Sequence, residues 1–599
     1  MTMTETIHYS VTPVSIAEHL VEVRLALPVS EKQGHTLSLP AWIPGSYMIR
    51  DFARHIITFT VTDSDGHRVE WKKTDKQTWQ IAPHHSPLTV TYQVYAFDLS
   101  VRSAYLCDDY CFFNGTSMFL HVEGLQHEPC KVRFARGCCP DSWHVFTTLC
   151  EQAASASYDF VEYTAADYDE LIDHPVLFTD AKQHAFHIDG IDFELIFCGG
   201  HQADVGRITL DVKTICEHHL TFFGSKPDID RYLFMTLLSD NGYGGLEHRS
   251  STALMFPRLE LPGPQHVNEM TDGYASFLGL CSHEFFHTWH VKRIRPSALQ
   301  HANLQQEVYT PQLWIYEGFT SYYDDLSLVR CGVISADKYL ELLGQNLTRV
   351  LRNQGRFKQS IAESSFDAWT KFYKQDASAI NNIVSYYTKG AIVALGLDLL
   401  IRQQSNHVYS LDTIMRMLWE RYGQHNIGTS DDVINTLCAE LLGVNVDGYI
   451  QTAVYGSEDV PIGDLLEHVG IRHHLRARNS ASDKGGKASE KVFNRDFGAI
   501  FSGKETGVVL NQIIENSPIA TAGAMIGDLL IAIDDWQVTA TNLYDVLQRL
   551  PENQSVSLLV LRQGRVKHLN MIVSPAVQDT VYLSIQDQQK AQRWLTPQQ

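Results

Sequence analysis

The chain has 599 residues, of which 44% are hydrophobic and 11% aromatic, which is enough for several hydrophobic cores. At about 150 residues per domain, this length predicts three or four domains. The formal net charge of −21, from 69 acidic and 48 basic residues, argues against a nucleic-acid-binding protein, which would need a basic surface.

Nothing in the sequence predicts a membrane span or export. No stretch approaches about 18 uninterrupted apolar residues, and the start, MTMTETIHYSVTP, has neither a basic nor an apolar signal segment. The eleven cysteines are odd in number and irregularly spaced. We therefore expect reduced thiols, a cytoplasmic location and no membrane partner.

The first 175 residues read as β-rich. The segments HLVEVRLAL, HIITFTVTD and LTVTYQVYAF alternate apolar and polar residues and are separated by turn residues. No long helical period interrupts them, so we predict an N-terminal antiparallel β-sandwich over residues 1–175.

Four further segments follow, and together they predict a multidomain α+β protein. Residues 176–476 begin with strands and one helix, and then become helical from about residue 272 to 450. Residues 477–492 are small and polar and read as a linker or long loop. Strands with one short helix return over 493–580, and a tail covers 581–599.

The helical part contains HEFFH, residues 283–287. His283 and His287 are four residues apart on a helix, so both side chains leave the same face. Their imidazole nitrogens can then reach one zinc ion at about 2.0–2.1 Å. Glu284 can lie beside the metal without binding it and accept a proton from the attacking water. The pattern alone also occurs on helices with ordinary surface histidines.

The third ligand has three candidates. His290 follows His287 by three residues, about 4.5 Å farther along a helix, so we expect a structural or pocket-lining role for it. Glu317 lies in LWIYEGFTSYY among apolar residues, where a buried carboxylate needs a partner such as zinc. We therefore predict Glu317 as the third ligand. A solvent-facing or ion-paired Glu317 is the alternative, and Glu307, which lies in a more polar stretch, is a poorer candidate.

HEFFH followed by LWIYEGFTSYY resembles the thermolysin-like zinc peptidases, and the second stretch is similar to one in the aminopeptidase N family. The longer gap of 29 residues, with HTWHVKRIRP, PAWIPGSYMIRDFARH and the C-terminal segment, resembles the glycyl aminopeptidase family over nearly the whole chain. The resemblance implies a thermolysin-like catalytic domain with one zinc ion per chain. His290 departs from the pattern, since an asparagine is expected there.

The resemblance also implies two substrate-handling groups. YGGLEHRSS is similar to the exopeptidase motif in which a glutamate, here Glu247, binds the free α-amino group of the substrate, and Gly244 and Gly245 belong to the same motif. SYYTKGAIV is similar to the stretch whose tyrosine, here Tyr387, stabilises the oxyanion. Tyr386 is the adjacent alternative.

The segment TGVVLNQIIENSPIATAGAMIGDLLIAIDDWQV resembles a PDZ domain. Its first strand, residues 507–509, could receive a peptide as an added strand. The alternative is that this module only docks on the rest of the chain and binds no peptide.

We therefore expect a zinc aminopeptidase that acts on peptides with a free N-terminus. The resemblance implies a preference for a small first residue such as glycine or alanine. The first alternative is a zinc endopeptidase, which needs no anchor such as Glu247. The second is a PDZ-type scaffold with a silent metal site.

Overall fold

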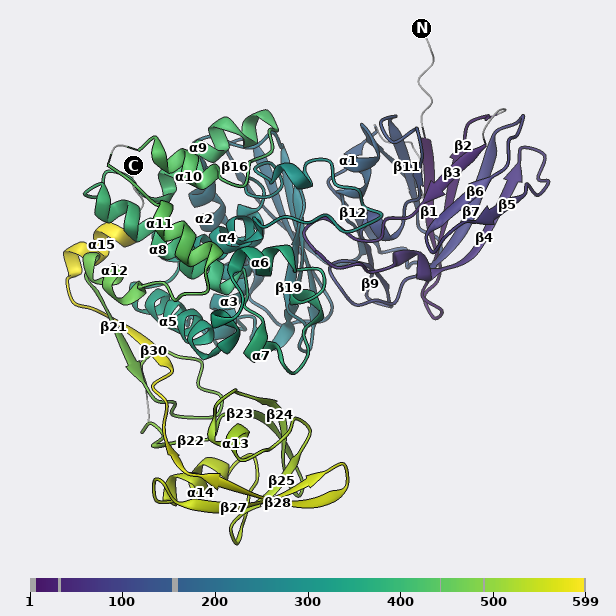
Figure 1. The fold of residues 1–599 in the computed structure, drawn as a ribbon. Coiled ribbons are helices and arrows are strands. Elements are labelled where there is room, and N and C mark those ends of the chain that lie inside the picture. The colour runs from purple at the N-terminus through teal and green to yellow at the C-terminus, as the bar shows by residue number, and fades with distance from the viewer. Residues whose placement is uncertain (1–6, 31–33, 153–159, 442, 489–490, 597–599) are drawn as a thin grey trace. The chain divides into compact units, whose positions relative to one another are not determined.

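The computed structural model describes residues 7–30, 34–152, 160–441, 443–488 and 491–596. The chain forms two compact units. Unit 1 comprises Met1–Val308 and Trp419–Thr429, and unit 2 comprises Tyr309–Leu418 and Ser430–Gln599. Figure 1 shows strands in the purple N-terminal part and helices in the teal and green middle part, as expected for a multidomain α+β protein.

The N-terminal part of unit 1 contains a seven-stranded sheet. In spatial order its strands are β13 (Cys150–Glu151), β14 (Phe160–Ala165), β11 (Cys130–Ala135), β1 (Ile7–Ser15), β2 (Leu20–Leu27), β7 (Leu88–Tyr95) and β4 (Ile56–Asp63). In β7, Leu88, Val90, Tyr92 and Val94 are buried and the residues between them are less so, which is the period of two of a strand with one face on the core.

Two four-stranded sheets share this core. One contains β10 (His121–Val122), β3 (His35–Ser38), β6 (Thr78–Ile81) and β5 (Trp71–Lys73), and the other contains β12 (His144–Phe146), β15 (Val176–Thr179), β9 (Tyr110–Phe113) and β8 (Ala104–Leu106). The short helices here are η1 (Phe52–His55), η2 (Gly115–Ser117) and α1 (Tyr168–Ile172).

The prediction of a purely antiparallel sandwich is wrong in one respect. β1 and β11 pair in parallel. The chain leaves the seven-stranded sheet after β7, forms strands of the smaller sheets, and returns to it at β11. A long crossover of this kind can bring a strand back in the same direction, which a short hairpin cannot do.

The rest of unit 1 is built on a five-stranded sheet in the order β16 (Gln183–Ile188), β17 (Ile191–Cys198), β18 (Arg231–Ser239), β20 (Ser251–Pro257) and β19 (Gly244–Glu247). Two helices, α2 (Val205–Phe223) and α3 (Asp272–Phe286), pack on each other, and α3 also packs on β19 and β20. The 3-10 turns are η3 (Arg258–Glu260), η4 (Ser297–Leu299) and η7 (Gly423–His425). The short strand β19 lies at the end of the sheet and beside α3.

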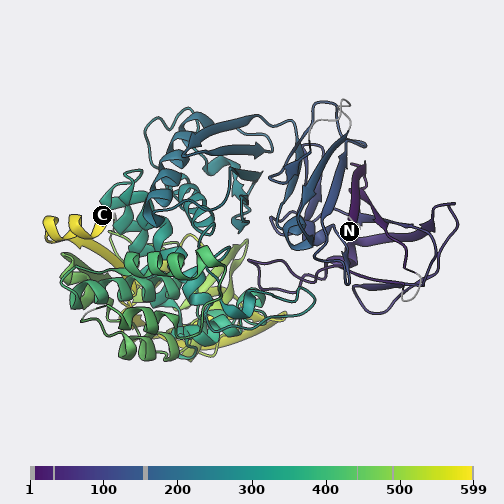
Figure 2. The same cartoon turned by 90° about the horizontal axis from the view of Figure 1, so that it is seen from above.

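Unit 2 begins with helices, which are teal and green in Figure 2. They are α4 (Leu313–Arg330), α5 (Ala336–Arg352), η5 (Gln354–Phe357), α6 (Ile361–Phe366), η6 (Phe372–Lys374), α7 (Ala379–Asn382), α8 (Thr388–Gln404), α9 (Leu411–Arg421), α10 (Val433–Ala439), α11 (Asp447–Ile450), η8 (Gln451–Tyr455) and α12 (Ile462–His468). The last residues of α9 belong to unit 1.

The C-terminal module of unit 2 has its own apolar core, which includes Phe497, Leu510, Leu530 and Leu558. Its sheet contains β23 (Ala499–Lys504), β24 (Gly507–Ile513), β25 (Leu529–Ile533), β27 (Ser555–Arg562), β28 (Arg565–Ile572) and β26 (Trp536–Gln537), and the helices α13 (Pro518–Thr521) and α14 (Leu543–Arg549) accompany it. A small sheet of β22 (Arg495–Asp496) and β29 (Ser574–Pro575) joins its two ends.

The chain returns from this module to the helices. After the segment around Arg476 and Asp483, which form a buried ion pair at 2.5 Å, the sequence runs into the module and comes back. β30 (Thr580–Ile585) then pairs with β21 (Ile471–Arg476), and α15 (Gln588–Leu595) packs against α4. The segment set apart in the sequence as a tail therefore contains a strand and a helix packed on the helical part of unit 2.

Among the described residues, each helix is too short or too polar to cross a lipid bilayer.

Candidate functional site

Helix α3 carries the HEFFH segment and determines where its side chains lie. The helix begins after Thr271, whose side chain accepts a hydrogen bond from the backbone N–H of Tyr274 at 3.1 Å, as an N-cap residue does. It ends at Phe286, so His287 is its C-cap. The rings of His283 and His287 lie one turn apart in a T-shaped arrangement, and their Nε2 atoms are 3.0 Å apart.

The tautomer of His287 follows from its other ring nitrogen. Nδ1 lies 2.8 Å from the backbone oxygen of His290. Because a carbonyl oxygen only accepts, Nδ1 carries the proton and the neutral ring keeps a lone pair on Nε2. A backbone carbonyl that holds a histidine in this way is a common support for a metal ligand.

The spacing of the two nitrogens fits a shared zinc ion. Two nitrogens bound at 2.0–2.1 Å with a tetrahedral angle lie about 3.3 Å apart, and the observed separation of 3.0 Å is close to that value. The imidazole pair of His283 and His287 therefore suits a zinc ion in both donor type and geometry.

His290 contributes through its backbone. Because α3 ends at Phe286, His290 lies beyond the helix and is not on the face of His283 and His287 that a continuous helix would give. Its ring is fully buried and packs edge-on against Phe286, with centroids 5.8 Å apart. The carbonyl that orients His287 could not be identified from the side-chain pattern.

Glu284 lies against strand β19. Its side chain is buried, and Thr252 Oγ1 on the neighbouring strand is 3.5 Å from its Oε2. A Cβ atom on Gly245 would fall 2.0 Å from Glu284 Oε1. Only a glycine therefore lets the carboxylate lie at this place.

Glu247 ends the same strand and is also buried. Its Oε1 is shielded from solvent and accepts no hydrogen bond from the described residues. A Cβ on Gly45 would lie 2.4 Å from Oε1 and 2.6 Å from Oε2, so only a glycine lets the backbone of residue 45 come this close to the carboxylate. A buried carboxylate with an unsatisfied oxygen calls for a cationic or hydrogen-bond-donating ligand.

Gly45 was not singled out in the sequence, although it lies in the conspicuous segment WIPGSY. Its φ of 90° is in the region that favours glycine. The Pro44–Gly45 pair could have been recognised in the sequence as a turn. Its proximity to Glu247, some 200 residues later, could not be predicted.

A buried ionic cluster supports the end of β19. Asp173 accepts from Lys292 Nζ at 2.7 Å, lies 3.3 Å from His248 Nδ1, and accepts from the backbone N–H of Arg249 at 3.2 Å. Burial would raise the pKa of Asp173, but Lys292 and His248 outweigh it and hold this pKa far below its usual range. The cluster joins His248, the residue after Glu247, to the segment that follows His287, and no sequence motif predicted it.

In unit 2, Glu317 is buried on α4, and Tyr387 is the N-cap residue of α8. The two helices approach closely because both have a glycine at the contact. A Cβ on Gly318 would lie 2.7 Å from the backbone of Gly390. The glycines that follow Glu317 and Tyr387 in their motifs thus fix the two helices against each other.

The two adjacent tyrosines have different environments. Tyr386 is fully buried, whereas Tyr387 is half-buried and its hydroxyl lies 3.2 Å from the hydroxyl of Tyr373. Burial, and then the negative charge of Glu317, raise the pKa of Tyr387 well above its usual value. The phenol therefore keeps its proton at neutral pH, as a hydrogen-bond donor must.

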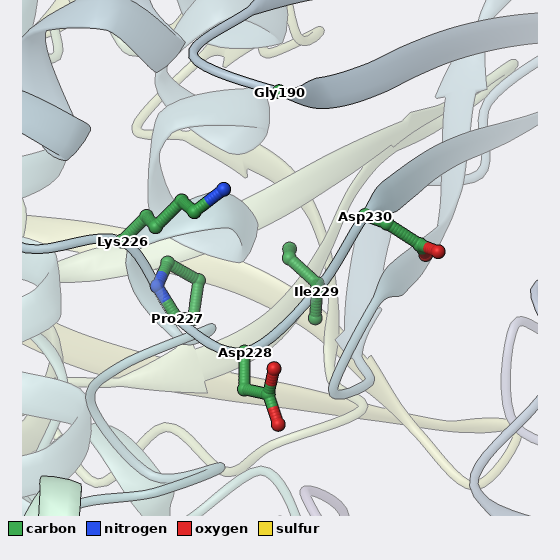
Figure 3. A pocket seen from close by; sticks show the side chains of 6 residues that line it. All are labelled: Gly190, Lys226, Pro227, Asp228, Ile229 and Asp230. Carbon is green, nitrogen blue, oxygen red and sulfur yellow. The ribbon is translucent and has the colours of Figure 1, made fainter.

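A cavity of about 560 Å³ lies elsewhere in unit 1, lined by Gly190, Lys226, Pro227, Asp228, Ile229 and Asp230 (Figure 3). It shares no residue with the candidate site. The site is therefore identified by its side chains and not by this cavity.

Two family models match the chain. The Peptidase M61 N-terminal domain matches residues 8–180, and the M61 glycyl aminopeptidase matches residues 276–393, which include α3 and the start of α8.

Among solved structures, the chain is similar to the aminopeptidase N family protein from Idiomarina loihiensis. The TM-score is 0.95 and the identity 39%, over 99% of this chain and 100% of that chain. The M1 zinc metallopeptidase from Deinococcus radiodurans is 14% identical with a TM-score of 0.46, over 76% of this chain and 95% of that chain, a likeness too low to carry an argument.

A probable periplasmic serine endoprotease DegP-like from Pseudomonas fulva (strain 12-X) is 39% identical over 64 residues. These residues are 10% of this chain and 13% of that relative. This chain thus spans a small part of that relative, and the similarity says nothing about the activity of this chain.

Proposed function

The chain belongs to the M61 glycyl aminopeptidase family and is a metallo-aminopeptidase, and from this premise we propose that it removes the N-terminal residue of peptides at a zinc centre. The family resemblance seen in the sequence is thereby confirmed. The observation that carries the proposal lies in β19. The buried, incompletely bonded carboxylate of Glu247 stands two residues from Gly245, against which Glu284 lies.

The proposed ligands are His283, His287 and Glu317, a combination of side chains that could hold a metal ion. Two imidazoles and one carboxylate, with a position left for water, are typical of a catalytic zinc site. Zinc bound there would supply Lewis-acid chemistry to the peptide carbonyl and the attacking water. We propose one zinc ion per chain.

Glu284 is the proposed general base. Its carboxylate accepts a proton from the attacking water while the water oxygen bonds to the carbonyl carbon. When the C–N bond breaks, the same group gives that proton to the leaving amine. The contact with Gly245 fixes the carboxylate beside the strand along which the substrate would lie.

Tyr387 is the proposed donor to the oxyanion. A neutral phenol can hydrogen-bond to the oxygen as negative charge develops on it. Tyr387 is partly exposed whereas Tyr386 is fully buried, which supports this role for Tyr387.

Glu247 is the proposed anchor for the substrate ammonium, with Gly244 and Gly245 beside the peptide backbone. The burial of this carboxylate, and its Oε1 without a hydrogen-bond partner among the described residues, support this role. The preference for a small first residue, glycine or alanine, is part of the proposal and is supported by the family description.

For the C-terminal module we propose a PDZ-like fold that docks on the helical part of unit 2. Asn381 Nδ2 donates to the oxygen of Ile513 at 2.7 Å, Glu515 N donates to Asn381 Oδ1 at 3.0 Å, and Lys358 pairs with Glu515 at 2.6 Å. A peptide ligand for the module is the alternative. All eleven cysteines are free thiols, which supports a cytoplasmic location.

The test uses the purified full chain. Zinc content is measured on the same sample as the rates with Gly-, Ala- and Leu-p-nitroanilide and with N-acetyl-Gly-p-nitroanilide. The proposal predicts about one zinc per chain and cleavage of the free substrates only. Equal cleavage of free and blocked substrates would favour the alternative of a zinc endopeptidase. A metal-free protein that cleaves neither would favour the alternative of a PDZ-type scaffold.

A further inference from the structure

Arg102 stands next to β19 without an acidic partner. It is half-buried on the turn before β8, and among the described residues it forms no ion pair. Its Nη2 donates to the backbone oxygen of Gly245 at 3.3 Å. Its Nε is shielded from solvent and has no hydrogen-bond partner in the described part of the chain.

The guanidinium covers the first residue of the strand. A Cβ on Gly244 would lie 3.7 Å from both Nη1 and Nη2 of Arg102, which is van der Waals distance. Because residue 244 is a glycine, no side chain separates the cation from a molecule that lies along β19. An arginine with an unused donor beside such a strand is suited to a planar acid.

The order of groups along β19 gives the direction of a bound peptide. The proposed ammonium anchor, Glu247, is at the end of the strand. The proposed base, Glu284, lies at Gly245, so the bond to be cleaved is on the Gly245 side of the anchor. The peptide therefore runs from Glu247 past Gly245 toward Gly244 and Arg102.

The distances along an extended chain indicate which substrate residues lie near Arg102. Both a strand and an extended peptide advance about 3.4 Å per residue. With the cleaved bond level with Gly245, where Glu284 lies, a peptide that runs antiparallel to β19 has its second and third residues on either side of the level of Gly244. These residues follow the cleaved bond.

We propose that Arg102 binds a carboxylate on the second or third residue of the substrate and so determines specificity on the leaving side. This inference rests on the proposed function. The carboxylate has two sources, the C-terminus of a di- or tripeptide and the side chain of an aspartate or glutamate. The competing explanation is that Arg102 has only a structural role, as the donor of a hydrogen bond to the backbone oxygen of Gly245.

The test compares substrate pairs that differ in one carboxylate. Gly-Ala against Gly-Ala-NH₂ and Gly-Ala-Ala against Gly-Ala-Ala-NH₂ probe the C-terminus, and Gly-Asp-NH₂ against Gly-Asn-NH₂ and Gly-Ala-Asp-NH₂ against Gly-Ala-Asn-NH₂ probe the side chain. The wild-type protein should prefer the acid in at least one pair, with the difference mainly in KM. R102Q should remove that preference, a change of about 10- to 150-fold in kcat/KM for a charge-assisted bond, and R102K should keep part of it.

Gly-p-nitroanilide, which has no carboxylate, reports on the rest of the site, including any effect of losing the bond from Arg102 to Gly245, and R102Q should lose less activity on it than on the preferred acid. Arg68→Gln, at an exposed arginine of the same part of unit 1, is the matched control and should change no pair. A wild-type protein with no acid preference in any pair overturns the proposal, as does an equal loss of R102Q on acid, amide and p-nitroanilide. If the wild-type protein cleaves no free peptide at all, the proposed function itself has failed.

Discussion

The carboxylate of Glu284 and the backbone of Gly245 are so close that a Cβ at residue 245 would fall 2.0 Å from Oε1. Strand β19 thus has two roles. It carries the proposed ammonium anchor, Glu247, and it holds the proposed base, Glu284, at Gly245, two residues before Glu247. This one contact couples the position of the base to the position of the substrate.

Gly245→Ala should therefore lower turnover while the zinc stays bound. The methyl group displaces the Glu284 carboxylate, and a misplacement of about 1 Å costs on the order of 100-fold in rate. Rates on Gly-p-nitroanilide and zinc content measured by mass spectrometry check this. Gly200→Ala is the control, since a Cβ there meets nothing within 4 Å. A fully active G245A protein would contradict the role of the contact.

Glu284→Gln should keep the metal and lose about 100- to 10,000-fold in kcat, the usual contribution of a positioned base. A chelator should abolish the activity of the wild-type protein, and added zinc should restore it. The metal content of the variant is measured beside its rate. Normal turnover by E284Q would show that another group takes the proton.

Glu247→Ala and Tyr387→Phe should give different patterns on one pair of substrates, a free peptide and its N-acetyl form. Loss of the ammonium contact should cost about 10- to 150-fold in kcat/KM on the free peptide only. Loss of an oxyanion donor should cost about 100- to 1,000-fold in kcat, whatever stands on the amino side. Identical patterns for the two variants would refute the separate roles.

Unit 1 should become less stable as the pH decreases below about 6.5, and His219 should be one cause. Burial, and then the neighbouring His218, hold the pKa of His219 well below its usual value. The folded state therefore stays neutral at residue 219 while the unfolded chain takes up a proton near pH 6.5. The unfolded state then binds more protons, so the free energy of unfolding decreases as the pH drops, by up to about 1.4 kcal/mol per pH unit for one group.

His219→Gln should remove this part of the pH dependence, because glutamine does not titrate and its amide can still meet Ser282 Oγ, which lies 3.0 Å from His219 Nε2. The check is the melting temperature between pH 8 and pH 5, with the exposed His144→Gln as control. The same slope in H219Q and wild type would exclude His219 as a contributor.

The effect on stability of removing the C-terminal module should depend on where the chain is cut. A protein ending at residue 492 loses β30 and α15, including the fully buried Trp594, which packs on Tyr339. It should unfold at a much lower temperature, since loss of one buried tryptophan side chain already costs about 3–5 kcal/mol.

Excision of residues 495–575 should be tolerated, because Ala576 N lies 3.2 Å from the oxygen of Asn494 and a two-glycine link can join them. This shortened chain should retain zinc and melt at the same temperature as the full chain. Trp594→Ala in the full chain measures how much of the loss in the truncated protein comes from this one side chain. Equal stability of the truncated and excised proteins would show that the returning segment is dispensable.

The sequence by itself determined what is local. His283, Glu284 and His287 could be identified because four-residue spacing on one helix fixes which side chains share a face, whatever surrounds the helix. The alternation in β7 and the helical period of α4 and α8 are local in the same way. The family motifs around Glu247, Glu317 and Tyr387 are also short and continuous, so the residues were named from sequence although their roles stay predictions.

Only the tertiary structure decided which distant segments meet. Gly45 lies on Glu247, Arg102 on Gly244 and Gly245, and Lys292 on Asp173, and no periodicity relates the members of these pairs. The same holds for the parallel pairing of β1 with β11 and the return of β30 to β21. Each depends on loop closure and on packing of whole sheets and helices, which sum many weak contacts over the chain and leave no signature in any one short stretch.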